Sequence, residues 1–230
     1  MSQHPPATTT ALLLSLCLCA STAAIAEEAM HHHEGMHQQA GTDPHAMHRA
    51  MLAKPSQALQ GQSTRIKLSD RELVNQAGEK LKFASEVVGD HIVVMDFVYT
   101  SCTTVCPVLS AILGQVQERL GDRLGPEVKM VSISVDPTRD TPGRLAAYAA
   151  KHKARDGWVW LTGEKPTVDR VLTELGAYAP AFEDHPSMVL VGDSRSGEWT
   201  RYFGFPGPDQ IMARVDELAM ARQNIKVGKR

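Results

Sequence analysis

The sequence lacks an excess of basic residues, a glycine-rich phosphate loop and any internal repeat. Lysine and arginine number 24 against 26 aspartates and glutamates, so the net charge is −2. Without surplus positive charge, we expect neither neutralisation of nucleic-acid phosphates nor attachment to an anionic membrane. The missing loop argues against a phosphate-binding site at a strand-to-helix junction. One globular domain is the expected organisation for 230 residues with 43% hydrophobic side chains.

Charged residues are absent from the first 26 positions. The apolar stretch there, about 16 residues, is shorter than the roughly 20 that a membrane-spanning helix needs. Ala24-Ile25-Ala26 supplies the small residues that signal peptidase requires, so residues 1–26 are predicted to be a signal peptide. We therefore expect export to the bacterial periplasm. An uncleaved membrane anchor is the alternative, because the first ten residues contain no Lys or Arg.

Cysteine is scarce, with four in the chain. Cleavage would remove Cys17 and Cys19, and Leu precedes each of them, which argues against a lipid anchor. Cys102 and Cys106 would then be the only thiols in an oxidising compartment. A disulfide between them would close a very short loop and contribute little chain entropy, so a structural staple is the less favoured interpretation.

Residues 27–62 have no apolar periodicity, which predicts a flexible arm rather than a domain. Imidazole and thioether groups bind copper, and methionine favours the cuprous ion. Ten such side chains occur within 22 residues: Met30, His31, His32, His33, Met36, His37, His45, Met47, His48 and Met51. We expect this arm to gather copper, and a solvated linker is the alternative.

The remainder of the chain alternates between strand and helix patterns. Residues 91–99 form an almost continuous β-branched and aromatic run, typical of a strand buried on both faces. Other strands are expected at residues 66–75, 80–83, 128–135, 158–161, 187–192 and 198–203, and helices at residues 105–120, 142–152, 166–175 and 211–219. This order predicts an α/β, thioredoxin-like fold for residues 63–222, with an N-terminal β-hairpin, a central mixed β-sheet flanked by helices, and a C-terminal tail at residues 223–230.

The segment Cys102-Thr103-Thr104-Val105-Cys106-Pro107 lies where the buried strand is expected to end and the first long helix to begin. A spacing of four residues on a helix start points both sulfurs the same way. The free amide groups there favour anions and lower a thiol pKa. A thiolate is both a nucleophile and a metal ligand, so this segment predicts either a redox pair or a metal site.

A third ligand is expected at His185, which precedes the last predicted hairpin. A thioredoxin-like fold places this loop beside the cysteine turn. Two thiolates suit Cu(I), and an added imidazole helps to bind Cu(II), so Cys102, Cys106 and His185 predict a copper site. An ordinary surface or capping histidine is the alternative.

The core resembles the SCO/SenC family of copper-binding, thioredoxin-like proteins. Four segments carry the resemblance: residues 97–107, 135–141, 184–185 and 202–204. The resemblance implies that Cys102, Cys106 and His185 are copper ligands. It also implies that the protein helps to assemble the dinuclear copper (CuA) centre of cytochrome c oxidase. Asp136 and Asp140 match an acidic motif near that site, although turn formation and helix capping explain them equally well. Pro186 departs from the family's usual Ser or Thr and keeps a thiol-redox function open.

Three functions follow from these residues. The favoured one is a metallochaperone that passes copper to an apo-cuproprotein, such as an oxidase subunit with a CuA site. The second is a thiol-disulfide oxidoreductase, in which Cys102 attacks the acceptor's disulfide and Cys106 resolves the mixed disulfide. A peroxidase is least favoured, because no positive partner for the thiol is evident. We expect a monomer, with a thioredoxin-like reductant as a further partner.

Overall fold

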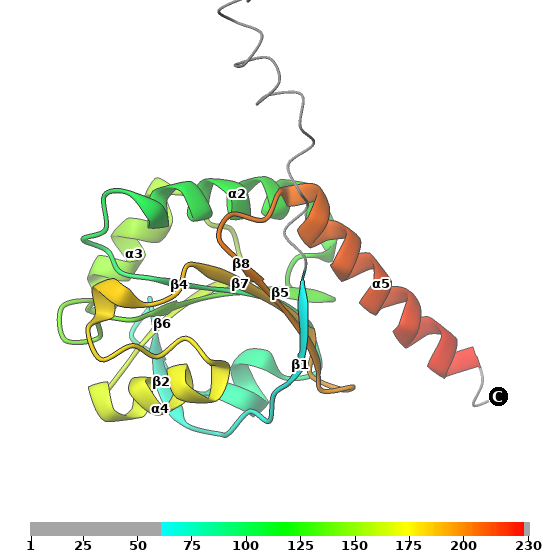
Figure 1. Cartoon of the computed structure of the whole chain (residues 1–230), viewed down its shortest axis with the longest axis horizontal. Helices are drawn as coiled ribbons and strands as arrows, with labels where there is room; N and C mark the ends of the chain where they lie inside the picture. The colour runs from blue at the N-terminus through cyan, green and yellow to red at the C-terminus, as the bar shows by residue number, and fades with distance from the viewer. Residues whose placement is uncertain (1–60, 228–230) are drawn as a thin grey trace, which may run out of the picture. The chain divides into compact units, whose positions relative to one another are not determined.

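The computed structural model describes residues 61–227, and the predicted signal peptide and nearly all of the predicted arm lie outside them (Figure 1). A mixed sheet with strand order β1-β8-β7-β4-β5-β6-β2-β3 forms the centre. Its strands are β1 (Gln62–Arg65), β2 (Glu72–Asn75), β3 (Lys80–Lys82), β4 (Ile92–Val98), β5 (Val128–Ser134), β6 (Trp158–Thr162), β7 (Met188–Asp193) and β8 (Glu198–Phe203). The helices are η1 (Phe83–Val88), α2 (Val105–Leu120), η2 (Gly121–Arg123), α3 (Pro142–Lys151), α4 (Lys165–Leu175), η3 (Phe182–Asp184) and α5 (Pro208–Val227).

Strand β4 is central, as the apolar run predicts. All seven of its residues are buried, and it pairs with β5 in parallel and with β7 in antiparallel register. Successive side chains of a strand point to opposite faces. Val94 and Val98 therefore belong to one core, and Val93 and Phe97 to the other.

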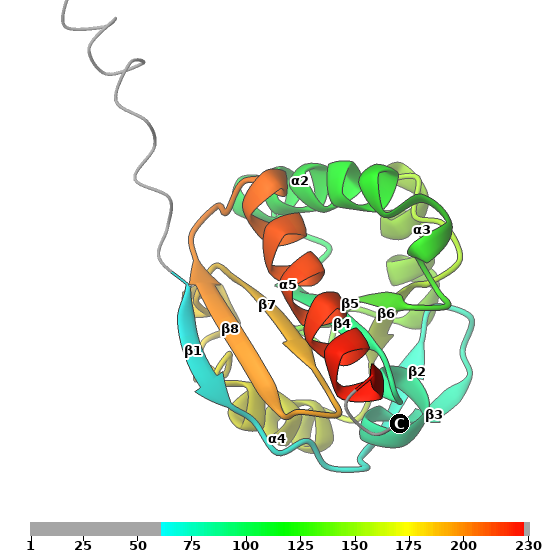
Figure 2. The ribbon, with the colours of Figure 1, turned by 90° about the vertical axis from the view of Figure 1, so that its right-hand side faces the viewer.

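Helices cover both faces of the sheet, which confirms the predicted thioredoxin-like fold (Figures 1 and 2). On one face, α2, α3 and α5 bury apolar residues against β4, β5 and β7. On the other face, η1 and α4 do the same. No helix within residues 61–227 is long and apolar enough to cross a membrane.

The N-terminal hairpin is present, but its first strand is shorter than predicted. Only residues 72–75 of the expected 66–75 form a strand, which pairs with β3 and with β6. Residues 66–71 instead cross from β1, at one edge of the sheet, to β2 near the other (Figure 2). Ile66 is buried in the α4-side core, which explains why an apolar pattern there does not indicate a strand.

Helix boundaries follow the predicted end signals. Thr141 caps α3, because its side chain accepts a hydrogen bond from the Arg144 amide at 3.4 Å, and Pro142 occupies the first helical position. Gly176 ends α4 in the left-handed conformation at φ +74°, which other residues rarely adopt. Helix α5 continues to Val227, beyond the boundary expected after residue 222.

The strand register brings distant segments to the same end of the sheet, where β4 and β8 finish and β7 begins. Asp96 near the end of β4 pairs with Val189 near the start of β7. Met188 pairs in turn with Phe203 at the end of β8. The loop that follows β4 and the loop that precedes β7 therefore meet at this end of the sheet. The predicted ligands lie in these two loops and at the start of α2.

Candidate metal centre and thiol pair

Both cysteines lie at the junction of β4 and α2, as predicted. The Cys102 amide donates to the Tyr99 carbonyl at 3.0 Å, which closes a turn after the strand. Cys106 is the second residue of α2, and its amide donates to the Cys102 sulfur at 3.4 Å. Both thiols are free and buried. The turn and the helix start thus hold the two sulfur-bearing residues together.

The Cys102 thiol is poised to ionise. Burial alone would raise its pKa, but hydrogen bonds from the Cys106 amide and thiol, the Thr104 amide and the Tyr99 hydroxyl outweigh burial and lower the pKa to about 6. The hydrogen bond that Tyr99 donates to Cys102 is the main cause that raises the pKa of Tyr99 to about 12, and burial is the second. Cys102 is therefore mainly thiolate at neutral pH, and Tyr99 remains a hydrogen-bond donor.

Cys106 has the opposite character. Burial raises the pKa of its thiol far above the usual range, and the neighbouring Cys102 and Asp96 charges raise it further. The pair therefore consists of one thiolate and one buried thiol. A metal ion that binds both sulfurs must displace the Cys106 proton.

Asp96 is a buried ionisable residue inside β4, on the face of the sheet that α2 covers. The Ser132 hydroxyl donates to Asp96 Oδ1 at 2.5 Å, while Oδ2 has no hydrogen-bond partner among the described residues. Burial raises the pKa of this carboxyl to about 7, even though the Ser132 hydrogen bond opposes the shift. A single Asp within an apolar run is a sequence signal for such a group, but our sequence interpretation did not use it.

His185 follows η3 and precedes β7, so it lies at the end of the sheet where β4 finishes, as expected. Its Nδ1 lies 2.7 Å from the Phe182 carbonyl oxygen. Because a carbonyl can only accept, Nδ1 carries the proton, and the lone pair of the neutral imidazole lies on Nε2. The His185 ring also meets the edge of Tyr99, with centroids 5.8 Å apart. Nε2 is therefore the atom that could bind a metal.

The three expected ligands do not form a ready-made cluster. Within residues 61–227, no three His, Cys, Asp or Glu side chains are close enough together to hold a metal ion. Cys102 and Cys106 are brought together, whereas His185 reaches them only through Tyr99, which interacts with both His185 and Cys102. Our sequence interpretation gave Tyr99 no role in the site, and its place three residues before Cys102 gives no signal of this contact.

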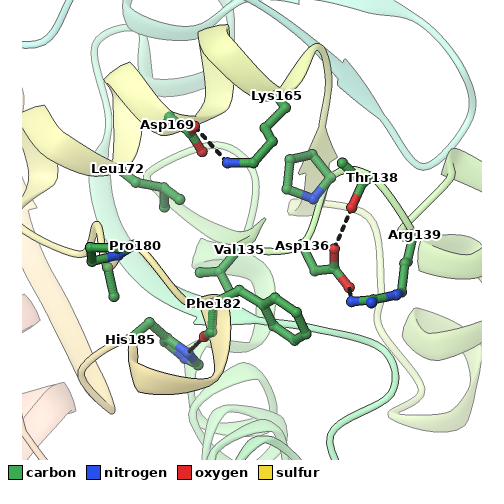
Figure 3. A pocket seen from close by; sticks show the side chains of 12 residues that line it. Val135, Asp136, Thr138, Arg139, Lys165, Asp169, Leu172, Pro180, Phe182 and His185 are labelled. Carbon is green, nitrogen blue, oxygen red and sulfur yellow. Dashed lines mark hydrogen bonds and ion pairs between the residues drawn. The ribbon is translucent and has the colours of Figure 1, made fainter.

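A pocket of about 210 Å³ adjoins His185 (Figure 3). Asp136 and Arg139 form an ion pair at 2.9 Å on one side, and Lys165 and Asp169 of α4 form another at 2.6 Å. The remaining wall is mostly apolar and includes Phe182. Pro186 follows His185 and is partly buried, and its redox role stays a prediction.

Comparison with known proteins identifies a matching family. The model of the SCO1/SenC family matches residues 60–219. A SCO1 homologue of Bacillus subtilis is 33% identical over 90 residues, which cover 39% of this chain and 45% of that protein. A protein of Stutzerimonas stutzeri, named as copper-binding, is 29% identical over 113 residues, which cover 49% of this chain and 53% of that protein. The matched regions thus span about half the length of these two relatives.

Solved structures share the fold. A SCO1/SenC family lipoprotein from Bacillus anthracis superposes with a TM-score of 0.60 at 24% identity, covering 69% of this chain and 98% of the other. BsSco, described as a member of the Sco family of cytochrome c oxidase assembly proteins with a disulfide switch, gives a TM-score of 0.57 at 24% identity, covering 69% and 96%. At these identities the superpositions support the fold.

Proposed function

The chain belongs to the SCO1/SenC family, and from this premise we propose that it is a copper metallochaperone. It binds one copper ion through Cys102, Cys106 and His185 and delivers the ion to a respiratory oxidase with a CuA site or to another exported cuproprotein. The observation that carries the proposal is the pair of free thiols at the start of α2, where the Cys106 amide donates to the Cys102 sulfur at 3.4 Å and hydrogen bonds lower the pKa of Cys102. The copper-binding relative and the oxidase-assembly relative support the metal and the acceptor.

The thiol pair suits transient binding of a soft ion. The Cys102 thiolate is the first ligand, and the Cys106 thiol joins as it loses its proton. Because Cys106 holds its proton strongly, protons compete with copper at that sulfur. This competition keeps the ion exchangeable, as transfer to an acceptor requires.

His185 completes the site by moving toward the sulfurs. Its Nε2 is free to bind, and Tyr99 must yield the space between the ring and Cys102. Cu(I) needs the two thiolates, and Cu(II) gains more from the imidazole.

A copper titration tests this proposal. The reduced domain, residues 61–230, is titrated with Cu(I) and Cu(II) against competing chelators, beside Cys102→Ser and His185→Ala. We expect one tightly bound ion, lost in Cys102→Ser for both oxidation states, and a His185→Ala variant that loses Cu(II) affinity more than Cu(I) affinity. Equal Cu(II) binding by the unsubstituted domain and His185→Ala would contradict the three-ligand site.

Thiol-disulfide exchange is a second candidate function, favoured by the asymmetry of the two thiols. The Cys102 thiolate attacks one sulfur of the acceptor's disulfide and releases the other as a thiolate. Cys106 then loses its proton and attacks the Cys102 sulfur, so the acceptor leaves as a dithiol and the chain keeps a Cys102–Cys106 disulfide. Rapid reduction of a protein disulfide together with loose copper binding would favour this function over the chaperone.

The His/Met-rich arm at residues 27–62 is proposed to gather copper for the same purpose. The last residue of the arm, Gln62, begins β1. The start of β1 lies at the same end of the sheet as the end of β4. The chain with and without residues 27–60 is titrated with Cu(I), and we expect additional bound ions only when the arm is present. Equal numbers of bound ions would assign the arm to a linker role.

The protein is proposed to act after export, in the periplasm, with residues 1–26 as its signal peptide. A respiratory acceptor faces the same compartment. Amino-terminal sequencing of protein recovered from a periplasmic extract tests this, with Glu27 as the expected first residue. Recovery of the intact N-terminus in the membrane fraction would indicate an uncleaved anchor instead.

A further inference from the structure

One loop touches both of the segments that carry the expected copper ligands. Residues 136–140 of this loop, which joins β5 to α3, are here called the anchor segment. We propose that the anchor segment positions the two halves of the metal site: Asp140 holds the turn of Cys102, and Arg139 holds the loop of His185. This inference rests on the proposed function, because these residues act through the copper ligands.

Asp140 fixes the cysteine turn. Its carboxylate is 1% exposed and accepts hydrogen bonds from the Thr100 amide at 3.2 Å and the Thr100 hydroxyl at 2.5 Å. The Ser134 hydroxyl, at the end of β5, donates to its other oxygen at 2.7 Å. Thr100 lies two residues before Cys102. A buried carboxylate with several donors is a strong constraint, so the cysteine turn is tied to β5 as well as to β4.

Arg139 fixes the other half of the site. Asp136 is 3% exposed, and it accepts from Arg139 Nη1 at 2.9 Å and from the Thr138 hydroxyl at 2.7 Å. This pairing holds the guanidinium over the Phe182 ring, with Cζ 5.1 Å from the ring centroid (Figure 3). The Arg139 side chain is itself 58% exposed, so the ion pair contributes little to stability. Its effect is to orient Phe182.

Phe182 transmits this constraint to His185. The Phe182 carbonyl accepts from the His185 amide at 3.3 Å and from His185 Nδ1 at 2.7 Å, which selects the tautomer with a free Nε2. The Phe182 ring also packs edge-on against Tyr99, with centroids 5.1 Å apart. Tyr99 in turn meets the His185 ring. Arg139 therefore influences which nitrogen of His185 can bind copper.

These contacts exceed what turn formation requires. The turn itself is closed by backbone hydrogen bonds from the amides of Arg139 and Asp140 to the Asp136 carbonyl, at 3.1 and 2.9 Å. The α3 cap is supplied by Thr141. The Arg139 and Asp140 side chains instead reach segments about 40 residues away in the sequence. Capping and turn formation thus leave these two side chains unexplained.

The test compares Arg139→Gln with Arg170→Gln, which removes an exposed arginine from α4. Both are made in the full chain with Cys17→Ser and Cys19→Ser, so that only Cys102 and Cys106 offer thiolate. In the metal-free protein, ¹⁵N NMR of the imidazole is expected to show the Nδ1–H tautomer in the control and a mixture in Arg139→Gln. Cu(II) affinity, followed by the thiolate-to-copper absorption band, is expected to fall about tenfold in Arg139→Gln, while Cu(I) affinity changes by less than about twofold.

Three outcomes decide the inference. Arg139→Lys keeps a cation over Phe182 and is expected to recover part of the Cu(II) affinity. If Arg139→Gln matched Arg170→Gln in both tautomer and Cu(II) affinity, the proposed positioning role would be wrong. Equal losses of Cu(I) and Cu(II) affinity with a lower melting temperature would also overturn it, in favour of a purely structural role. Failure of the unsubstituted chain to bind copper would contradict the proposed function, and the metal-free NMR comparison would still decide the inference.

Discussion

At the scale of single residues, the two thiols differ sharply although four positions separate them. Cys102 accepts hydrogen bonds from the helix start and from Tyr99, whereas Cys106 faces the interior and the Asp96 carboxylate. The pair therefore combines a thiolate at Cys102 with a protonated thiol at Cys106. Both features fit the proposed function, in which a soft metal ion binds to the pair and is later released.

The Tyr99 hydroxyl is expected to control the ionisation of Cys102. In the domain of residues 61–230, thiolate ultraviolet absorption should rise with one midpoint near pH 6, because only Cys102 has a lowered pKa. Tyr99→Phe removes one donor to the thiolate, so the midpoint should move upward. Tyr178→Phe, at a 43% exposed tyrosine, is the matched control and should leave the midpoint unchanged. A single step near the ordinary thiol pKa of about 8.5 for both cysteines would contradict this account.

Asp96 is expected to make stability fall as the pH rises. Its pKa is raised to about 7, so between about pH 4 and pH 7 the folded state keeps a proton that the unfolded state has lost. The loss of unfolding free energy over that range is on the order of 4 kcal/mol. Asp96→Asn should therefore gain stability relative to the unsubstituted domain as the pH rises from 5 to 8, measured by urea unfolding.

The exposed Asp122→Asn provides the control for the Asp96 experiment. It should follow the unsubstituted domain at every pH. If Asp96→Asn showed the same pH dependence as this control, Asp96 would not titrate near neutrality in the folded state.

Sequence patterns predict the residues whose position in the chain fixes their role. The cysteine pair follows from a buried strand that ends before an amphipathic helix. Tyr99 and Phe182 could not be predicted, because they are 83 residues apart and meet only once β4 and β7 are paired. Asp96 was open to prediction as a lone charge in an apolar strand.

At the scale of elements, strand and helix patterns with clear end signals were predicted within a few residues, among them β4, α2 and α4. The crossing at residues 66–71 was not, because an apolar pattern does not distinguish a strand from a segment that packs across the sheet. The end of α5 was also misjudged. Its C-terminal part is fastened by a side chain whose partner lies on β7.

Arg222 is that side chain. It donates through Nε to Asp193 Oδ2 at 2.9 Å, and its Nη1 donates to the Asp90 carbonyl at 2.9 Å. Asp193 is buried, so Arg222→Gln leaves a buried carboxylate without its main partner. We expect a loss of about 3 kcal/mol in the free energy of unfolding, measured in guanidinium chloride.

Arg170→Gln is the comparison for Arg222, because it removes a positive charge from an exposed helix position. This control should change stability by less than about 0.5 kcal/mol. Equal stabilities of the two variants would show that α5 does not depend on the ion pair with Asp193.

At the scale of the whole molecule, two hydrophobic cores support the site at the end of the sheet where β4 finishes. The cysteine turn is anchored on the α2 side, and the His185 loop packs through Phe182 on the α4 side. Copper that binds both parts should therefore stabilise the whole domain. With free Cu(I) held at about a thousand times its dissociation constant, the gain in unfolding free energy should be about 4 kcal/mol.

That stabilisation is measured by thermal or chemical unfolding of the domain with and without Cu(I). Cys102→Ser should abolish it, whereas Ser101→Ala, at the exposed neighbouring position, should retain it. The same gain in Cys102→Ser would place the copper elsewhere on the domain.

The most direct test of the central claim is X-ray absorption spectroscopy of the Cu(II)-loaded domain of residues 61–230. The account predicts a first shell with two sulfur atoms and one imidazole nitrogen, and loss of that imidazole contribution in His185→Ala. A copper shell without sulfur, or one whose imidazole contribution persists in His185→Ala, would contradict the account.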